Sequence, residues 1–476
     1  MQLNSLDFMF FLSFVCFFYF IVPGKIKNII LLTASYVFYA RGGVIHAAVL
    51  FLITVITYLM AYFMNQYASY KKGILTASVI LEIGILAASK YFLFFSSYFA
   101  GWNIIVPLGV SFYTLQAIGY LVDLYRGNVS FERNFIIHAL FLSFFPYAVS
   151  GPVERAGHMF VQFRDIHRFD YERVCHGMQL FLWGGAVKVI LADRLAVLAN
   201  ELLSNPVKYT GFELFVGVIL YTLQIYCDFS AYSDMAVGTA RILGFDILQN
   251  FTRPYFAETI SEFWSRWHRS LSFWLRDYLY VPLGGSRKGL VRKHVNLGIV
   301  FLVSGIWHGT GWNFIVWGLL YAVYYVCSGL TRNTRTYFWN KRKIRTDRWD
   351  VRFLRKVSTF LMVAFAWIFF YASDLNAAVE ILQSMFRFNN VGILFSANAF
   401  HVGGMVGKDW IVLGVGLLVL LFVDFLREKK IQLCRMIDAQ SIVVRWTVYI
   451  GLMTAVLIFG VYGPGYEAQA FIYQAF

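Results

Sequence analysis

Ten apolar stretches, each about long enough to cross a lipid bilayer, constrain the fold of this sequence more than any other feature. A helix of about 20 apolar residues spans the hydrocarbon core of a membrane. The ten stretches are residues 8–23, 44–64, 73–89, 104–122, 178–200, 212–226, 296–327, 357–371, 410–425 and 444–462. Three shorter stretches, residues 29–40, 91–100 and 135–149, are candidates for tilted spans or re-entrant helices. The sequence therefore predicts an all-α integral membrane protein with roughly 10–12 transmembrane helices plus re-entrant or interfacial helices.

The low content of charged residues supports the same fold class. Only 14% of the residues are charged and 59% are hydrophobic, whereas a soluble domain carries about 25% charged residues. The net charge of +15 does not indicate a nucleic-acid-binding protein, because the basic residues cluster in short segments between apolar stretches. The largest cluster, residues 332–356, holds ten Lys or Arg and two Asp. Such clusters are typical of cytoplasmic loops of membrane proteins.

The basic clusters also predict how the chain crosses the membrane. Residues 332–356 and 427–435 are expected to be cytoplasmic, and the last span then places the C-terminal tail, residues 463–476, outside. Lys25 and Lys27 place the first loop inside and the N-terminus outside. Neither a linker nor an internal repeat is apparent, so residues 1–476 are predicted to form a single integral membrane domain.

Residues 261–285 are too polar for a span that faces lipid. As one helix, the segment would place its aromatic residues on one side and most of its charged residues on the other. The aromatic and aliphatic side comprises Trp264, Trp267, Leu271, Trp274, Leu275 and Tyr278, and the charged side comprises Glu262, Arg266, Arg269 and Arg276. This pattern predicts an interfacial or re-entrant helix, which ends at the PLGG sequence of residues 282–285.

His308 is the foremost candidate for catalysis. It follows the apolar stretch 297–303, and the glycines Gly305, Gly309 and Gly311 allow close backbone approach and leave room for a ligand. Ionisable groups at membrane depth are costly and often functional, and histidine is the usual general base near neutral pH. The alternative is a structural histidine that is hydrogen-bonded to a neighbouring helix.

Three further polar residues lie in apolar surroundings. His268 lies beside Trp267, where it is either a second catalytic group or a polar tip at the membrane interface. Asp228 and Asp234 are six residues apart, so they do not share a helix face and do not form a glycosidase-like pair. A structural role is favoured for both, with Arg241 or the arginines of residues 261–285 as partners.

Several function classes leave no signature in this sequence. The five cysteines are scattered without a Cys-x-x-Cys pair, which indicates neither a disulfide framework nor a metal site. Walker, Gly-x-Ser-x-Gly and His-Glu-x-x-His motifs are absent from the sequence. A reaction catalysed by this chain therefore has to draw its energy from an activated donor, and we expect no bound cofactor.

Four long motifs resemble the membrane-bound O-acyltransferases. The motifs are PLGVSFYTLQAIGYLVDLYRG (107–127), YCDFSAYSDMAVG (226–238), EFWSRWHRSLSFWLRDYLYVPLGG (262–285) and GIWHGTGWNFIVWG (305–318). Within the family the sequence is most similar to the bacterial branch that O-acetylates alginate and peptidoglycan, with the teichoic-acid D-alanylation protein as a relative. The resemblance implies a helical fold around a central cavity and transfer of an acyl group from a cytoplasmic thioester to an acceptor beyond the membrane.

The resemblance also implies roles for particular residues. The essential histidine of the family falls on His308 and its second histidine on His268, while Asp228, Asp234 and Arg276 occupy motif positions. Trp307 and Asn313 lie in the motif of His308 and are expected to support it. In the tail, Tyr473 is a candidate acyl carrier on the outer side, although an aromatic anchor at the interface explains it equally well.

The sequence therefore predicts an O-acyltransferase of the bacterial cytoplasmic membrane. We expect an acetyl group, acetyl-CoA as its donor, a hydroxyl acceptor leading to an extracytoplasmic polysaccharide, and a partner transferase of the SGNH type outside the membrane. The alternative is a flippase or secondary transporter of a cell-envelope precursor, for which inverted repeats and paired interrupted helices would be typical.

Overall fold

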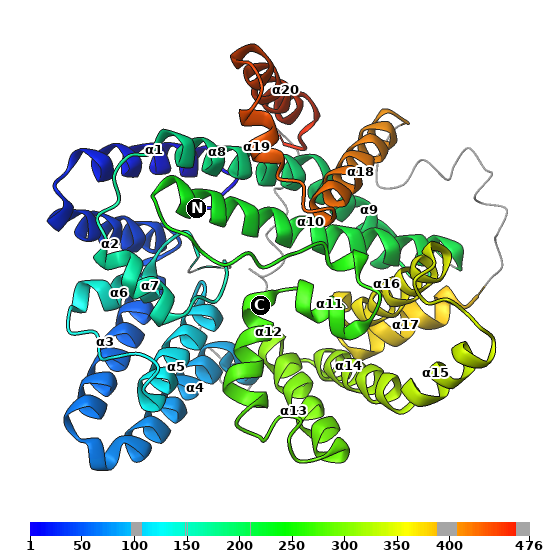
Figure 1. The fold of residues 1–476 in the computed structure, drawn as a ribbon, viewed down its shortest axis with the longest axis horizontal. Coiled ribbons are helices and arrows are strands. Elements are labelled where there is room, and N and C mark those ends of the chain that lie inside the picture. The colour runs from blue at the N-terminus through cyan, green and yellow to red at the C-terminus, as the bar shows by residue number, and fades with distance from the viewer. Residues whose placement is uncertain (97–106, 148, 150, 210, 388–406, 463–476) are drawn as a thin grey trace. The chain divides into compact units, whose positions relative to one another are not determined.

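The computed structural model describes residues 1–96, 107–147, 149, 151–209, 211–387 and 407–462 (Figure 1). Throughout these residues the regular structure is helical, without a strand. Eight helices are long and apolar enough to cross a membrane: Val44–Gln66, Ala68–Lys90, Phe212–Ile242, Leu290–His308, Trp312–Leu330, Trp349–Tyr371, Gly407–Glu428 and Ile442–Phe459. Two shorter apolar helices are Leu6–Ile21 and Ile26–Ala40. The predicted all-α integral membrane fold is confirmed, and the count of 10–12 crossings stays a prediction.

The described residues group into two compact units. The N-terminal unit comprises residues 1–182 and 232–250, and the C-terminal unit comprises residues 183–231 and 251–476. Helices α8 (Tyr171–Ala186) and α10 (Phe212–Ile242) each contribute residues to both units. The single integral domain stays a prediction, because a chain that passes between compact units twice within helices is compatible with one domain or two.

The N-terminal unit combines helices of span length with shorter ones. Its helices are α1 (Leu6–Ile21), α2 (Gly24–Ala40), α3 (Val44–Gln66), η1 (Ala68–Tyr70), α4 (Lys71–Ser96), α5 (Val110–Arg126), α6 (Phe135–Ser143), α7 (Ala156–Arg164) and the start of α8. With nine residues each, α6 and α7 are about 14 Å long. Asn134 caps the first turn of α6 through its side-chain oxygen, which accepts from the Ile136 N–H at 2.9 Å. The stretch 135–149 is therefore not a complete span.

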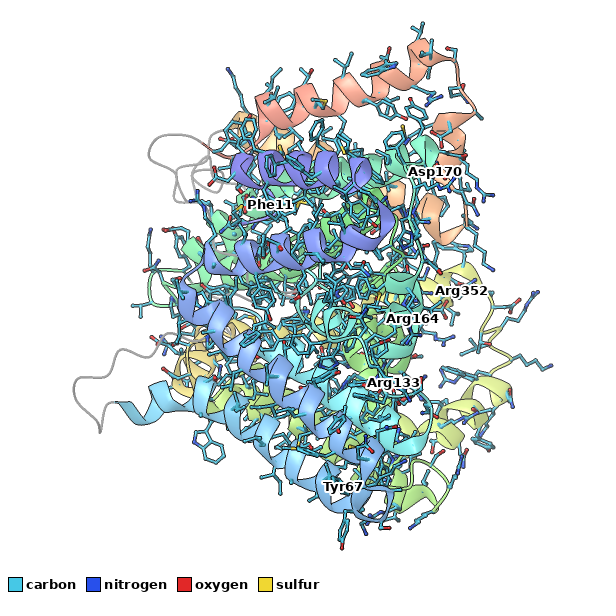
Figure 2. All side chains as sticks on the ribbon, turned by 90° about the vertical axis from the view of Figure 1, so that its left-hand side faces the viewer. Phe11, Tyr67, Arg133, Arg164, Asp170 and Arg352 are labelled. Atoms are coloured by element: carbon cyan, nitrogen blue, oxygen red, sulfur yellow. The ribbon has the colours of Figure 1, made fainter. Side chains whose placement is uncertain are left out.

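The polar loops of the N-terminal unit lie together at one edge. Figure 2 shows Arg133, Arg164 and Asp170 on the same side of this unit. The side chain of Asn28, in the first turn of α2, donates to the Phe163 carbonyl at 2.7 Å, and Lys27 donates to the His167 carbonyl at 2.5 Å. The start of α2 is thus joined to the end of α7, as expected for loops that share one aqueous side.

The C-terminal unit holds most of the candidate site residues. Its helices are η2 (Val187–Ala192), α9 (Asp193–Leu203), part of α10, η3 (Pro254–Phe256), α11 (Ile260–Arg266), α12 (Arg269–Leu275), η4 (Arg276–Tyr280), α13 (Leu290–His308), α14 (Trp312–Leu330), α15 (Arg332–Lys341), α16 (Trp349–Tyr371), α17 (Leu375–Met385), α18 (Gly407–Glu428), α19 (Leu433–Asp438) and α20 (Ile442–Phe459). Figure 1 shows α13 and α14 side by side as an antiparallel pair beside α11 and α12.

Glycines set the close packing of α13 against α14. A Cβ atom at Gly305 would lie 2.4 Å from the Phe314 carbonyl oxygen, and one at Gly318 would lie 2.3 Å from the Phe301 carbonyl oxygen. At Gly309 a Cβ atom would lie 2.2 Å from the Phe314 ring. Of the two uses predicted for Gly305 and Gly309, close backbone approach is therefore correct, because α14 fills the space that was also considered for a ligand.

Candidate active site

His308 is the last residue of α13, at the end opposite the basic end of that helix. Arg292 and Lys293 lie in the first turn of α13, and a helix of 19 residues is about 28 Å long. The imidazole is 2% exposed. Its ring centroid lies 4.8 Å from that of Trp307, 5.0 Å from Trp317 and 5.3 Å from Phe370. The polar ring is thus held in an aromatic enclosure at the far end of a helix whose start is basic.

His268 lies between α11 and α12, where the helical conformation is interrupted. Its φ of 40° is in the left-handed region, which costs energy for a non-glycine residue. The expectation of one continuous helix over residues 261–285 is therefore wrong. The segment forms two short helices that end and begin at Trp267–His268, followed by the π-helical turn η4. The predicted aromatic side is nevertheless the buried side, with Trp264, Trp267 and Trp274 all buried.

Burial fixes the protonation state of His268. The side chain is 1% exposed, and its ring centroid lies 4.9 Å from that of Phe229. This residue lies outside the eight spanning helices. Burial disfavours the charged imidazolium and lowers the pKa of His268 to about 3. His268 is therefore neutral near pH 7 and suited to hydrogen bonding rather than to carrying charge.

Trp307 brings the two histidines to one place. Its ring centroid lies 4.8 Å from that of His308 and 6.5 Å from that of His268. The structure thus places near one indole the two histidines that sequence resemblance paired.

Asn313 and Arg276 have separate roles around this centre. The Asn313 amide is buried and donates to the carbonyl oxygens of Phe369 at 3.1 Å and Ala372 at 2.8 Å, which ties the start of α14 to the end of α16. The Arg276 guanidinium is exposed and donates to Asp277 at 2.8 Å. Asn313 therefore stabilises the enclosure of His308, whereas Arg276 is available to a solute.

Asp228 belongs to a buried ion triad that sequence reasoning missed. The Lys188 ammonium lies 2.7 Å from Asp228 Oδ1 and 2.9 Å from Asp193 Oδ1, and the three side chains are 5%, 1% and 6% exposed in that order. The partner of Asp228 is thus Lys188, from the π-helical turn η2, whereas an arginine was expected. Asp228 precedes Phe229, whose ring contacts His268. The signal that could have found this triad is a lysine in the middle of the apolar stretch 178–200, which needs a buried carboxylate partner.

The remaining candidate residues, Asp234 and Tyr473, are not among the described residues around His308 and His268. Asp234 is partly buried on α10 and belongs to the N-terminal unit. Tyr473 and the whole tail 463–476 lie outside the described residues. Among the residues that the structure describes, no group of three or more His, Cys, Asp or Glu could hold a metal ion.

A cavity of about 1220 Å³ runs along α13 toward His308. On this helix its lining includes Leu290, Lys293, Leu297 and Ser304, which follow one another at helical spacing, and His308 is the next position in the row. The basic side chains that line the cavity are Arg276, Lys293, Arg332, Arg335 and Arg355. The one carboxylate in the lining, Glu258, is paired with Arg352 at 2.7 Å and Arg355 at 3.1 Å. The cavity thus combines a cationic rim with an apolar inner part.

Comparison with known proteins shows which family this chain belongs to. Residues 132–373 match the membrane-bound O-acyltransferase family. The chain is 35% identical to the probable alginate O-acetylase AlgI of Azotobacter vinelandii over 390 residues, which cover 78% of this chain and 75% of that protein. It is 32% identical to the peptidoglycan O-acetyltransferase of Helicobacter pylori, covering 79% and 77%, and 28% identical to the teichoic acid D-alanyltransferase of Bacillus subtilis, covering 69% and 85%. The chain is therefore an O-acyltransferase that belongs to the membrane-bound O-acyltransferase family.

Proposed function

We propose that this protein transfers an acetyl group from a cytoplasmic thioester to a hydroxyl acceptor outside the membrane, for the O-acylation of an extracytoplasmic polysaccharide. The observation that carries the proposal is a cavity that follows α13 from its basic end as far as Ser304, one helical turn before His308. The names of the relatives support the choice of group and acceptor, because they refer to O-acetylation of alginate and of peptidoglycan.

The cationic rim of the cavity favours acetyl-CoA as the donor. The nucleotide part of coenzyme A carries several phosphate charges, which guanidinium and ammonium groups bind strongly. Lys293, Arg332 and Arg335 supply such groups at the end of the cavity where the positive-inside rule predicts cytoplasm. The uncharged pantetheine arm fits the apolar inner part, with its thioester directed toward His308.

His308 acts as the general base. The imidazole accepts the proton of the acceptor hydroxyl, and the oxygen attacks the thioester carbonyl carbon. As the tetrahedral intermediate collapses, the carbon–sulfur bond breaks and the imidazolium returns the proton to the departing thiolate. Atoms and charge therefore balance without a cofactor. His268, held neutral by burial and also near Trp307, supports His308.

The place of the hydroxyl acceptor follows from the predicted orientation of the chain in the membrane. With the basic clusters in the cytoplasm, His308 lies toward the outer side, so the acetyl group alone has to cross the protein. The first acceptor is then Tyr473 in the tail or a serine of an extracytoplasmic SGNH-type partner, and either would pass the acetyl group to the glycan. Both termini lie outside the cytoplasmic membrane of a bacterium in this proposal.

The chemistry is tested by the His308→Ala variant in purified protein with labelled acetyl-CoA and a hydroxyl acceptor. We expect acetyl transfer to fall at least about 100-fold with expression and thermal stability unchanged. The matched control is His294→Ala on the same helix, which is expected to keep full transfer. Retained transfer in His308→Ala, or counterflow of an intact envelope precursor in that variant, would favour a transporter instead.

The donor site has a separate test, because Cys327 is exposed and lines the cavity. A protein that keeps Cys327 as its one reactive thiol should be alkylated by a maleimide more slowly when acetyl-CoA is present. Labelling at the same rate with saturating acetyl-CoA would exclude this cavity as the donor site.

A further inference from the structure

Helix α15 connects two helices of spanning length on one side of the membrane. It begins two residues after α14 ends at Leu330, and the next helix of spanning length, α16, begins at Trp349. The segment between these two helices, residues 331–348, therefore has both of its ends at one membrane surface. None of the residues of α15 is buried, and Figure 1 shows the helix at the periphery of the C-terminal unit.

One face of α15 belongs to the cavity. The residues of this helix that line the cavity are Arg332, Arg335, Thr336 and Trp339. They recur at helical spacing and therefore lie on one side of α15. The Arg335 guanidinium donates to the carbonyl of Ser328, another lining residue, at 3.0 Å. The rotation of α15 about its own axis is thus set by the cavity.

The opposite face of α15 combines exposed aromatic rings with cations. This face, called here the outer face, comprises Thr334, Tyr337, Phe338 and Lys341. The side chain of Tyr337 is 62% exposed and that of Phe338 is 51% exposed. The Lys341 ammonium lies 5.8 Å from the centroid of the Tyr337 ring, and the guanidinium of the next residue, Arg342, lies 5.3 Å from that of Phe338. Each exposed ring thus has a cation beside it.

The cations at the end of α15 are available to an anion. Lys341, Arg342 and Lys343 form no ion pair within the part of the chain that the structure describes. The two acids that follow, Asp347 and Asp350, are paired with arginines at 2.9 Å and 2.8 Å. Cations at the C-terminal end of a helix are favoured by its dipole, but the dipole does not account for exposed rings next to them.

Rings and cations side by side on an exposed helix suit the boundary between lipid headgroups and acyl chains. Aromatic side chains prefer this boundary, and Lys and Arg reach from it to phosphate groups. Trp349, at the start of α16, is 81% exposed and is of the kind that marks the same level. A soluble anion would engage the cations alone and leave the rings of Tyr337 and Phe338 in water. The combination therefore favours an anionic lipid.

We propose that the outer face of α15 binds the anionic phospholipid headgroups of the membrane that α14 and α16 cross. This inference goes beyond the proposed acyl transfer and does not depend on the identity of the donor. Because one helix carries both faces, lipid bound to the outer face holds Arg332 and Arg335 at the cavity.

Two threonines on opposite faces of α15 provide the test. Thr334→Cys on the outer face and Thr336→Cys in the cavity lining are made in full-length protein without other reactive thiols. Alkylation by an uncharged maleimide is timed in phosphatidylcholine bilayers with and without phosphatidylglycerol. We expect phosphatidylglycerol to slow the labelling of Thr334→Cys at least about fivefold relative to Thr336→Cys, since one basic residue contributes about that factor at an anionic surface. The ratio removes any general effect of surface charge on thiol reactivity.

The role of the cations is tested by adding Lys341→Gln and Arg342→Gln to Thr334→Cys, which should abolish the dependence on phosphatidylglycerol. The matched control is Lys71→Gln with Lys72→Gln at the start of α4, which removes the same charge elsewhere and should preserve the dependence. Equal slowing of both thiols, or slowing that persists without Lys341 and Arg342, would overturn the proposal. Labelling of Thr334→Cys that ignores phosphatidylglycerol would also overturn it and would leave the outer face for an acidic protein.

Discussion

The buried triad of Lys188, Asp193 and Asp228 gives the sharpest prediction on stability. One ammonium lies within 2.9 Å of both carboxylates, and all three side chains are at most 6% exposed. Replacing Lys188 with Met removes the positive charge and leaves two carboxylates close together without a counter-charge. Breaking a buried ion pair by removing one partner costs about 3–5 kcal/mol. We therefore expect Lys188→Met to lower the free energy of unfolding by about that amount.

The cause of this loss can be isolated, because the carboxylates can be neutralised as well. The triple variant Lys188→Met, Asp193→Asn, Asp228→Asn has no buried charge and should recover most of the lost stability. Lys208→Met is the control: its ammonium lies 2.8 Å from Glu201 but is 64% exposed, so its loss should barely change stability. The assay is unfolding by SDS in mixed micelles, followed by tryptophan fluorescence.

Two results would refute the reasoning. If Lys188→Met were as stable as Lys208→Met, the triad would not carry the charge balance that its geometry indicates. If the triple variant were less stable than Lys188→Met alone, hydrogen-bond geometry rather than uncompensated charge would explain the loss.

Two further predictions concern the surroundings of the histidines. Gly305→Ala should destabilise the protein by about 1–3 kcal/mol, because its Cβ atom would lie 2.4 Å from the Phe314 carbonyl oxygen. The control is Gly298→Ala on the same helix, whose Cβ atom meets nothing within 4 Å, so that this variant should be neutral or slightly stabilising. Equal effects of the two variants in thermal unfolding would contradict the close packing. Folding lowers the pKa of His268 from 6.5 to about 3. As the pH falls, the unfolded state therefore binds a proton before the folded state does. The free energy of unfolding decreases below pH 6.5, by about 2 kcal/mol at pH 5. In His268→Phe the decrease in unfolding free energy between pH 7 and pH 5 should be smaller by that amount, and an unchanged decrease would show that His268 does not titrate this way.

The sequence predicts the fold class well because the physics involved is local. Apolar stretches of span length report helices in lipid whatever their tertiary partners, and the basic ends of α13 and α14 follow from composition alone. His308 is a candidate for the same reason, since an ionisable residue in apolar surroundings is conspicuous in one sequence, and its catalytic role stays a prediction. The neighbouring glycines were read less completely, because periodicity does not reveal that Phe314 fills the space beside Gly305 and Gly309.

Features that depend on partners far apart in the chain could not be predicted. The helix is interrupted at His268, where neither Gly nor Pro is present, so the left-handed φ of 40° is imposed by packing rather than by local preference. Lys188 and Asp228 are separated by 40 residues, and charge alone does not choose between Lys188 and the arginines of residues 261–285. The ring contacts of Trp264 with Trp317 and Tyr321 likewise join α11 to α14, which only the folded chain brings together.

The position of His308 at the end of α13 has a consequence for the proposed transfer of an acyl group across the membrane. Lys293 and His308 lie at opposite ends of this helix. In the proposed mechanism, the phosphates of the donor therefore stay at the cationic rim while its thioester reaches His308. An acceptor that approaches from the other end then meets the same carbonyl carbon without entering the cavity. Because the donor's charged part never has to leave the basic side, the energetic cost of moving charge through the membrane does not arise. Lengthening α13 between Lys293 and His308 should therefore abolish acetyl transfer without weakening the binding of the donor's nucleotide part.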